Sequence, residues 1–362
     1  MKIATIIGAR PQFIKASPVS KALAACGHVE EFLVHTGQHS DDSMSEVFFR
    51  EMRIPAPKYH LGIAGLKHGA MTGRMMEAIE NILIAETPDW TLVYGDTNST
   101  LAGALAACKL NIPVAHVEAG LRSFNRRMPE EINRICTDHV STMLFAPTRT
   151  AIRNLEKEGV AGDKILMTGD VMYDSTIAFS RLAKEQSRIL AELGLSPGGY
   201  LLATIHRAEN TDDPSRLNAI LDGLNQASHS LPVVLPLHPR TRNAVANLGH
   251  GFTGGVKIVN PVGYLDMLVL ESNARLIATD SGGVQKEAYF HGVPCVTFRE
   301  ETEWVELVEA GANRLASPTN PGSIMHAIDA ALGAPRNEFD RGDLYGHGNA
   351  ADQIAAWFSQ VR

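Results

Sequence analysis

Short runs of apolar, mostly β-branched residues alternate with longer segments of helical periodicity along this chain. A first series of strands is predicted over residues 3–7, 32–35, 91–94 and 114–117. Helices are predicted after them, over residues 13–26, 69–86, 99–110 and 129–140. A second series of strands, each followed by a helical segment, is predicted over residues 201–205, 233–237, 256–259, 276–279 and 294–298. Such alternation is typical of parallel sheets covered by helices on both faces, so we predict an α/β fold.

The two series of strands predict two domains, each with its own sheet. A chain of 362 residues is longer than one typical core requires and long enough for two. The predicted boundary lies near Asp170, which gives a first domain over residues 1–170 and a second over residues 171–349. A last helix is predicted over residues 350–362, and whether it returns to the first domain is left open.

Charge and composition exclude several classes of partner. The chain has 40 acidic and 33 basic residues, so it gains nothing from nonspecific attraction to phosphate backbones, and no nucleic-acid partner is expected. No segment is apolar enough to span a bilayer, and residues 1–10 lack the features of a signal peptide. The four cysteines form no Cys-x-x-Cys pair, which is typical of buried thiols in a reducing compartment. We therefore expect a cytoplasmic protein without a membrane partner.

The polar residues that follow each strand are the candidate site, because ligands of open parallel sheets bind beyond the carboxyl ends of the strands. The first strand is followed by Gly-Ala-Arg-Pro at residues 8–11, which lacks the glycine spacing of a dinucleotide site. Arg10 and Lys15 are suited to hold a diphosphate, Arg10 as a bidentate donor and Lys15 as a point charge. A surface turn with two solvated cations is the alternative, and these residues alone favour neither interpretation.

Carboxylates follow two further strands of the first series. Asp96 stands where the third strand gives way to a helix, and it is either a catalytic carboxylate or, with Thr97, a candidate helix cap. Glu118 ends the fourth strand, where a buried carboxylate needs a partner. Arg122 or a bound ligand is a candidate partner, and a structural ion pair would explain Glu118 equally well.

The helix predicted from Pro129 begins with two glutamates, Glu130 and Glu131. Proline in the first turn and an acidic residue near the positive end of the helix dipole are common, and they account for one glutamate. They do not account for the second glutamate. They also leave unexplained a nearby cluster of arginines, which comprises Arg122, Arg126, Arg127 and Arg134.

The second series has its strongest signal between residues 276 and 287. Ser281, Gly282 and Gly283 separate a strand from a helix, where free backbone N–H groups bind phosphate and glycines permit its close approach. Glu287 follows one turn later and is suited to accept both hydroxyls of a ribose, whereas a plain helix start is the less favoured alternative. His206 follows another strand and is suited to act as an acid, a base or a phosphate donor, although an isolated loop histidine is the commoner case.

Two histidine patterns predict neither a metal site nor a thiol nucleophile. His35 and His39 lie four residues apart but in a predicted loop, without the helix and third ligand that a metal site needs. Cys136 and His139 have a spacing that fits helix packing, and no group is evident to orient the histidine.

Six ordered motifs together closely resemble the non-hydrolysing UDP-N-acetylglucosamine 2-epimerase family. They are Gly-Ala-Arg-Pro at 8–11, Gly-Asp-Thr at 95–97, His-Val-Glu-Ala-Gly-Leu-Arg at 116–122, Pro-Glu-Glu-Ile-Asn-Arg at 129–134, His-Arg-Ala-Glu-Asn at 206–210 and Thr-Asp-Ser-Gly-Gly at 279–283. The resemblance runs from Gly8 to about Asn313. It implies the glycosyltransferase-B type of fold, with two Rossmann-like domains and a cleft between them, and it implies a homodimer.

The resemblance also implies residue roles and a substrate. The catalytic positions of the family are matched by Asp96, Glu118, Glu130 and His206. The UDP-binding positions are matched by Arg10, Lys15, Ser281, Gly282, Gly283 and Glu287, and a position near the diphosphate by Arg134. The implied substrate is a UDP-linked 2-acetamido sugar, and neither a metal nor another cofactor is required.

Some residues depart from the common bacterial pattern of this family. Ala208 stands in place of an arginine and Lys286 in place of a glutamate, and the segment 302–306 also differs. The versions of segments 11–15 and 302–306 look like the branch that includes epimerases of UDP-2,3-diacetamido-2,3-dideoxyglucuronate. The alternatives are a glycosyltransferase of the same fold, which the fold alone does not exclude, a nucleotide-sugar-binding regulator without turnover, and a hydrolysing epimerase.

Overall fold

The computed structural model describes residues 1–38, 54–249, 251–333 and 343–361. The chain forms two compact units, Met1–Ile177 with Asp343–Arg362, and Ala178–Gly342. The division falls inside α7 (Val171–Gln186), whereas the sequence places the boundary near Asp170. The start of α7 belongs to the first unit because Asp174 accepts backbone N–H groups of Ala350 and Ala351 at 3.2 and 2.8 Å.

The first unit contains a seven-stranded parallel sheet in the order β3-β2-β1-β4-β5-β6-β7. Its strands are β1 (Lys2–Ile7), β2 (Glu30–His35), β3 (Tyr59–His60), β4 (Trp90–Tyr94), β5 (Val114–Val117), β6 (Met143–Ala146) and β7 (Ile165–Met167). The interior strand β1 is buried on both faces, with Ile6 paired to Val34 on one side and Val93 on the other. Continuous apolar strands of this kind are typical of a sheet with helices on both faces.

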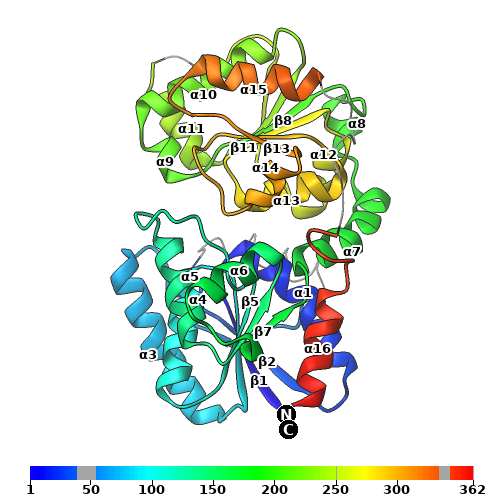
Figure 1. Ribbon diagram of the computed structural model, residues 1–362. Coiled ribbons are helices and arrows are strands. Elements are labelled where there is room, and N and C mark those ends of the chain that lie inside the picture. The colour runs from blue at the N-terminus through cyan, green and yellow to red at the C-terminus, as the bar shows by residue number, and fades with distance from the viewer. Residues whose placement is uncertain (39–53, 250, 334–342, 362) are drawn as a thin grey trace. The chain divides into compact units, whose positions relative to one another are not determined.

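Helices cover both faces of this sheet, with α3, α4 and α5 on one face and α1 and α16 on the other (Figure 1). Their bounds are α1 (Arg10–Ala25), α3 (His68–Glu86), α4 (Asn98–Lys109), α5 (Pro129–Val140), α6 (Arg149–Lys157) and α16 (Ala350–Gln360), with a short 3-10 turn at Gly162–Lys164. The helix α5 begins at Pro129, whose fixed φ suits a first helical position. The last helix, α16, packs on α1 and places Phe358 against Trp90 and Phe145.

The second unit has a six-stranded parallel sheet in the order β10-β9-β8-β11-β12-β13. Its strands are β8 (Leu201–Thr204), β9 (Val233–Pro236), β10 (Val256–Val259), β11 (Leu276–Thr279), β12 (Cys295–Thr297) and β13 (Asn313–Leu315). Its helices are α8 (Ile189–Leu193), α9 (Ala208–Thr211), α10 (Pro214–Ala227), α11 (Pro239–Ala246), α12 (Tyr264–Asn273), α13 (Gly282–His291), α14 (Val305–Glu309) and α15 (Pro321–Gly333).

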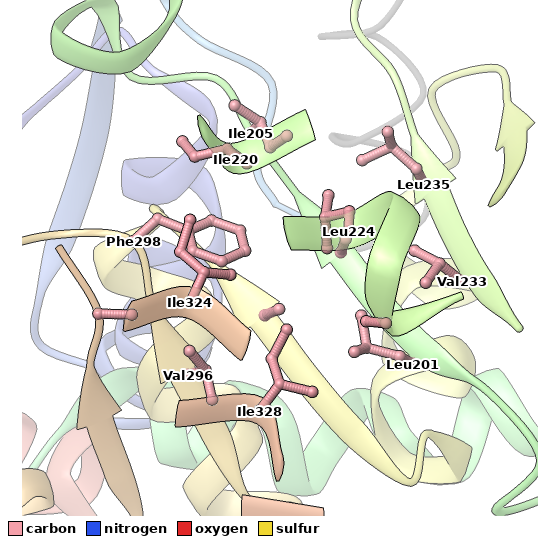
Figure 2. Close-up of a cluster of buried hydrophobic side chains, with 14 of the residues drawn as sticks. Leu201, Ile205, Ile220, Leu224, Val233, Leu235, Val296, Phe298, Ile324 and Ile328 are labelled. Carbon is pink, nitrogen blue, oxygen red and sulfur yellow. The ribbon is translucent and has the colours of Figure 1, made fainter. Parts of the chain in front are cut away.

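A buried apolar cluster fixes one face of the second sheet. Figure 2 shows Ile220 and Leu224 of α10 and Ile324 of α15 against side chains of the sheet and the segments that follow its strands, such as Phe298. All four residues are fully buried. Because all strands of this sheet are parallel, their carboxyl ends lie at one edge, where the candidate site residues of this unit lie.

The predicted α/β class is confirmed, and all nine predicted strands are present. Four further strands were not predicted, namely β3, β6, β7 and β13, which have 2, 4, 3 and 3 residues. Segments this short are too brief to show a hydrophobic periodicity in the sequence. They are strands because each pairs with an adjacent strand of its sheet.

The contact of α16 with the first sheet predicts a large loss of stability when Phe358 is truncated. Phe358 is fully buried, so Phe358→Ala removes its burial and leaves a cavity, at a cost of about 3–5 kcal/mol. Urea unfolding followed by fluorescence should show an earlier first transition. The exposed Gln360→Ala on the same helix is the control and should change the midpoint little. Equal midpoints for both variants would contradict this packing.

Candidate active site

Three predicted motifs of the first unit lie side by side, because β1, β4 and β5 are neighbours in its sheet. Asp96 follows β4 and Glu118 follows β5, and both lie near the start of α1. The Nζ atom of Lys15 forms an ion pair with Oε2 of Glu118. A Cβ placed on Gly95 would lie 3.1 Å from this carboxylate oxygen and 3.2 Å from the lysine nitrogen, so the pair rests against the backbone beside Asp96.

Glu118 forms an ion pair with Lys15. This pair supplies the partner that a buried carboxylate at the end of an apolar strand needs. Both side chains are largely buried, at 6% and 9% exposure. Arg122, the partner that the sequence suggested, points elsewhere and pairs with Asp138 and Glu158, each at 2.7 Å. The suggestion of Arg122 was wrong because the backbone turns sharply at Glu118, which has a φ of 71°. Such a conformation is costly for a residue other than glycine and is common at functional sites.

Arg134 binds Asp96 and thereby joins a second motif to the first. Its Nη2 lies 2.7 Å from Oδ2 of Asp96, and its Nη1 lies 2.7 Å from Oε2 of Glu131. The side chain of Asp96 is 31% exposed, whereas that of Arg134 is 3% exposed. The helix cap of α4 is Thr97, which accepts the N–H of Thr100, so Asp96 is not needed as a cap.

The two glutamates at the start of α5 differ in their surroundings. Glu131 is buried and accepts the backbone N–H groups of Ser123 and Phe124, each at 2.9 Å. Glu130 is partly exposed and has no ion-pair partner within the described ranges. Glu131 therefore holds the preceding loop, and Glu130 is the carboxylate available to solvent.

The start of α1 is closely packed around Gln12. Its side-chain oxygen accepts the N–H groups of Gly8 and Ala9 at 2.8 and 3.1 Å. Gly8 is sterically required, since a Cβ there would overlap the hydroxyl groups of Thr36 and Ser99. Arg10 is the first residue of α1 and is partly exposed beside this turn. The hydrogen bonds of Gln12 therefore fix the backbone of the turn that carries Arg10.

In the second unit, Ser281 caps α13 and Gly282 and Gly283 form its first turn. The hydroxyl of Ser281 accepts the N–H of Val284 at 3.5 Å. The cap by Ser281 agrees with the alternative interpretation, in which this segment is only a helix start. It satisfies one N–H group of the first turn, however, and the other N–H groups of that turn remain suited to bind a phosphate. A Cβ on Gly282 would lie 2.5 Å from Oε1 of Glu303, so a larger residue there would displace the carboxylate of Glu303.

His206 lies beside the same helix end and is held through its backbone by Asp280. This fully buried carboxylate accepts the N–H groups of His206 and Arg207 at 3.1 and 3.0 Å, and the side-chain amide of Asn210 at 3.1 Å. Nδ1 of His206 lies 3.4 Å from the same carboxylate. The His206 side chain is 54% exposed, so the loop is fixed while the imidazole stays accessible.

Glu287 lies on α13, buried except for 4% of its surface, and contacts Glu271 of α12. Burial, together with the charge of Glu287 and the hydrogen bond to it, raises the pKa of Glu271 well above its usual value. A raised pKa favours the neutral acid form of Glu271, which can donate a hydrogen bond to Glu287. This arrangement suits a carboxylate that accepts hydroxyl groups of a ligand.

The remaining predictions concern metals, thiols and membranes. Across the described ranges, no group of three or more potential ligands is arranged to hold a metal. The ring of His35 stacks on those of His60 and Phe13, and His39 lies outside the described residues. Burial raises the pKa of the Cys295 thiol to about 12. In the part of the chain that the structure describes, no helix has the length and apolar character to cross a membrane.

Comparison with known proteins decides the family. A family model described as UDP-N-acetylglucosamine 2-epimerase matches residues 21–359. The chain belongs to this family. The family resemblance and the assignment to the epimerases, which are isomerases, are thereby confirmed.

Relatives of this epimerase family match the chain over nearly its whole length. A Pseudomonas aeruginosa protein named UDP-2,3-diacetamido-2,3-dideoxy-D-glucuronate 2-epimerase is 54% identical, over 100% of both chains. The UDP-N-acetylglucosamine 2-epimerase of Methanocaldococcus jannaschii is 43% identical, over 98% of both. A crystal structure of a UDP-GlcNAc 2-epimerase from the same archaeon, in complex with UDP-GlcNAc and UDP, has a TM-score of 0.93 at 42% identity, over 100% of both chains. The predicted two-domain, glycosyltransferase-B type of fold is confirmed by this match.

Sequence reasoning missed two buried carboxylates that organise the epimerase motifs. Asp138 lies one helical turn beyond Arg134 on α5, and this spacing was the available signal for it. Asp280 lies inside the Thr-Asp-Ser-Gly-Gly motif, but its role required the fold, because its partners are some 70 residues away.

The loop that carries His206 should loosen when Asp280 is removed. Asp280→Ala deletes the acceptor of the His206 and Arg207 N–H groups, so hydrogen exchange at both amides should accelerate. Asp213→Ala is the matched control, because Asp213 accepts the N–H groups of Ser215 and Arg216 at the start of α10 and no hydrogen bond from the described residues of the His206 loop. Unchanged exchange at His206 in the Asp280 variant would show that other contacts hold the loop.

Proposed function

We propose that this chain interconverts UDP-2,3-diacetamido-2,3-dideoxy-D-glucuronate and its carbon 2 epimer by removing UDP and adding it back. The choice of sugar rests on one observation. The chain is 54% identical to the P. aeruginosa epimerase of that name, against 43% for the M. jannaschii UDP-N-acetylglucosamine 2-epimerase. UDP-N-acetylglucosamine is the second candidate substrate, because the family model and the archaeal relatives bear its name.

The proposed reaction is an elimination followed by an addition, since the hydrogen on carbon 2 is not acidic enough for simple exchange. UDP leaves carbon 1 with the electron pair of the carbon–oxygen bond, a carboxylate takes the carbon 2 proton, and a 2-acetamidoglycal remains. A proton then reaches carbon 2 from the opposite face, and the UDP oxygen bonds again to carbon 1. The products balance without an oxidant, a metal or another cofactor.

The proposed proton-transfer set consists of Asp96, Glu118 and Glu130, with His206 as a further catalytic residue. Support comes from the pairing of Glu118 with Lys15 and of Asp96 with Arg134. Cations suited to a departing diphosphate thus lie next to carboxylates suited to move a proton. The carboxylates are assigned as a set, because neighbouring carboxylates share their titration.

The proposed UDP-binding residues come from both units. Arg10, Lys15 and Arg134 supply positive charge from the first unit. In the second unit, Ser281, Gly282 and Gly283 offer the N-terminus of α13 to a phosphate, and Glu287 accepts the ribose hydroxyls. A homodimer and a cytoplasmic location, which the family resemblance and the composition suggested, stay predictions.

The alternative function is that of a glycosyltransferase of similar fold. Incubation of the UDP-sugar without an acceptor distinguishes a glycosyltransferase from an epimerase by the products. The epimerase converts one UDP-sugar into a second, and a binding protein changes nothing. Without acceptor, a transferase at most hydrolyses the substrate to UDP and the free sugar of unchanged configuration, whereas a hydrolysing epimerase gives UDP and the free carbon 2 epimer. We expect a second UDP-sugar when the diacetamido-glucuronate substrate is followed by NMR, with slower or no turnover of UDP-N-acetylglucosamine.

Epimerisation in heavy water should place deuterium at carbon 2 of the product. The elimination takes the original proton onto a side chain, and the returning proton comes from groups that exchange with solvent. Proton NMR of the product measures the loss of the carbon 2 signal. Product that keeps its original hydrogen would contradict the elimination and leave the UDP site untouched.

Replacing Glu287 should weaken UDP binding without unfolding the protein. Glu287→Gln keeps the size of this buried side chain but removes a charge-assisted hydrogen bond of about 1.5–3 kcal/mol, which is roughly a tenfold to hundredfold increase in Kd. Isothermal titration calorimetry with UDP measures this Kd. Glu309→Ala, an exposed glutamate of the same unit, is the control and should bind UDP normally. Equal affinities would remove Glu287 from the nucleotide site.

A further inference from the structure

His116 is a fully buried histidine of β5 that none of the proposed catalytic roles uses. Each of its ring nitrogens has an oxygen partner at 2.7 Å. Nδ1 contacts Oδ1 of Asp138, and Nε2 contacts the backbone oxygen of Gly95. The ring therefore spans from α5 to the loop that follows β4.

Both partners of His116 are acceptors, and this fixes the protonation of the ring. A backbone carbonyl can only accept a hydrogen bond, so Nε2 must donate to Gly95. Burial alone would raise the pKa of Asp138, but its contacts with His116 and Arg122 hold that pKa below its usual value. Asp138 is therefore a carboxylate, which also only accepts, and Nδ1 must donate to it. A ring that donates from both nitrogens is an imidazolium.

The buried charge of this imidazolium is balanced. Oδ2 of Asp138 accepts Nη1 of Arg122 at 2.7 Å, and Nη2 of Arg122 lies 2.7 Å from Oε2 of Glu158. The network thus contains two cations and two carboxylates. A buried charge costs several kcal/mol when it has no partner, so removing one member should disturb the others.

The network ends on the backbone of the two loops that carry the proposed carboxylates. Gly95, whose carbonyl is held by His116, directly precedes Asp96. Gly120, whose N–H donates to Asp138 at 3.1 Å, lies two residues after Glu118. These loops have unusual backbones, with a φ of 63° at Gly95, 71° at Glu118 and 82° at Gly120. Conformations of this kind persist only where surrounding contacts impose them.

We propose that His116, as an imidazolium bound to Asp138, is a positioning residue that fixes the loops of Asp96 and Glu118 for proton transfer. The inference rests on the proposed function for the roles of those two carboxylates. His116 is fully buried, so we assign it no contact with the substrate. It acts through the Gly95 carbonyl directly and through Asp138 on Gly120.

Three variants test this role in the full chain. His116→Gln and Asp138→Asn each remove one charge, and misplacing the loops should lower kcat roughly tenfold to a hundredfold while UDP affinity stays unchanged. The double variant restores an uncharged pair, so its loss of kcat should be smaller than the product of the two single losses. Leu83→Ala on α3 is the control, since it creates a cavity in the same unit away from the network and should lower stability but not kcat.

The ¹⁵N spectrum of the wild-type imidazoles tests the protonation without any variant. Both nitrogens of His116 should carry protons in this spectrum, because both face acceptors. A neutral ring, wild-type kcat in folded single variants, or multiplicative losses in the double variant would overturn the proposal. Should the wild type epimerise neither sugar, the proposed function would fail, whereas the spectrum would still decide whether His116 is an imidazolium.

Discussion

The carboxylates at the ends of the first sheet are stable there only because each has a partner that the fold supplies. Glu118 meets Lys15, Asp96 meets Arg134, and Asp138 meets both His116 and Arg122. Without these partners, burial would favour the neutral acids or the unfolded chain. The packing of α1 and α5 against the strand ends is thus an electrostatic requirement as much as an apolar one.

This requirement explains why cations and carboxylates share one edge of the first sheet. A group that stabilises a buried carboxylate in the folded chain is also suited to stabilise a diphosphate, because both ligands are anionic oxygens. The second unit differs, since Asp280 accepts backbone N–H groups of the His206 loop, and the N-terminus of α13 lies at the carboxyl edge of the second sheet. One unit therefore offers charged side chains, and the other offers backbone donors held in place.

The match to a solved epimerase covers the whole chain, so the chain shares the two-domain fold of its family. What distinguishes members is the sugar, and here the closer match is to an enzyme named for a diacetamido-glucuronate. Under the proposed function, both candidate substrates carry UDP and a 2-acetamido group, so the same proposed phosphate donors and proton-transfer set would serve either one. Differences between substrates should therefore lie outside the residues that the motifs share.

The sequence by itself determined the class of fold, the nine main strands, the motifs behind them and the family. Periodicity and strand-end chemistry are local, so they survive without coordinates. The sequence could not assign Lys15 rather than Arg122 to Glu118, separate Glu131 from Glu130, or identify the role of Asp138. These depend on side-chain direction at turns such as Glu118, and on contacts between residues 103 apart in the case of Lys15 and Glu118. Only the tertiary structure determines such contacts, because it decides which charged groups are buried, and a buried charge is stable only when it is paired.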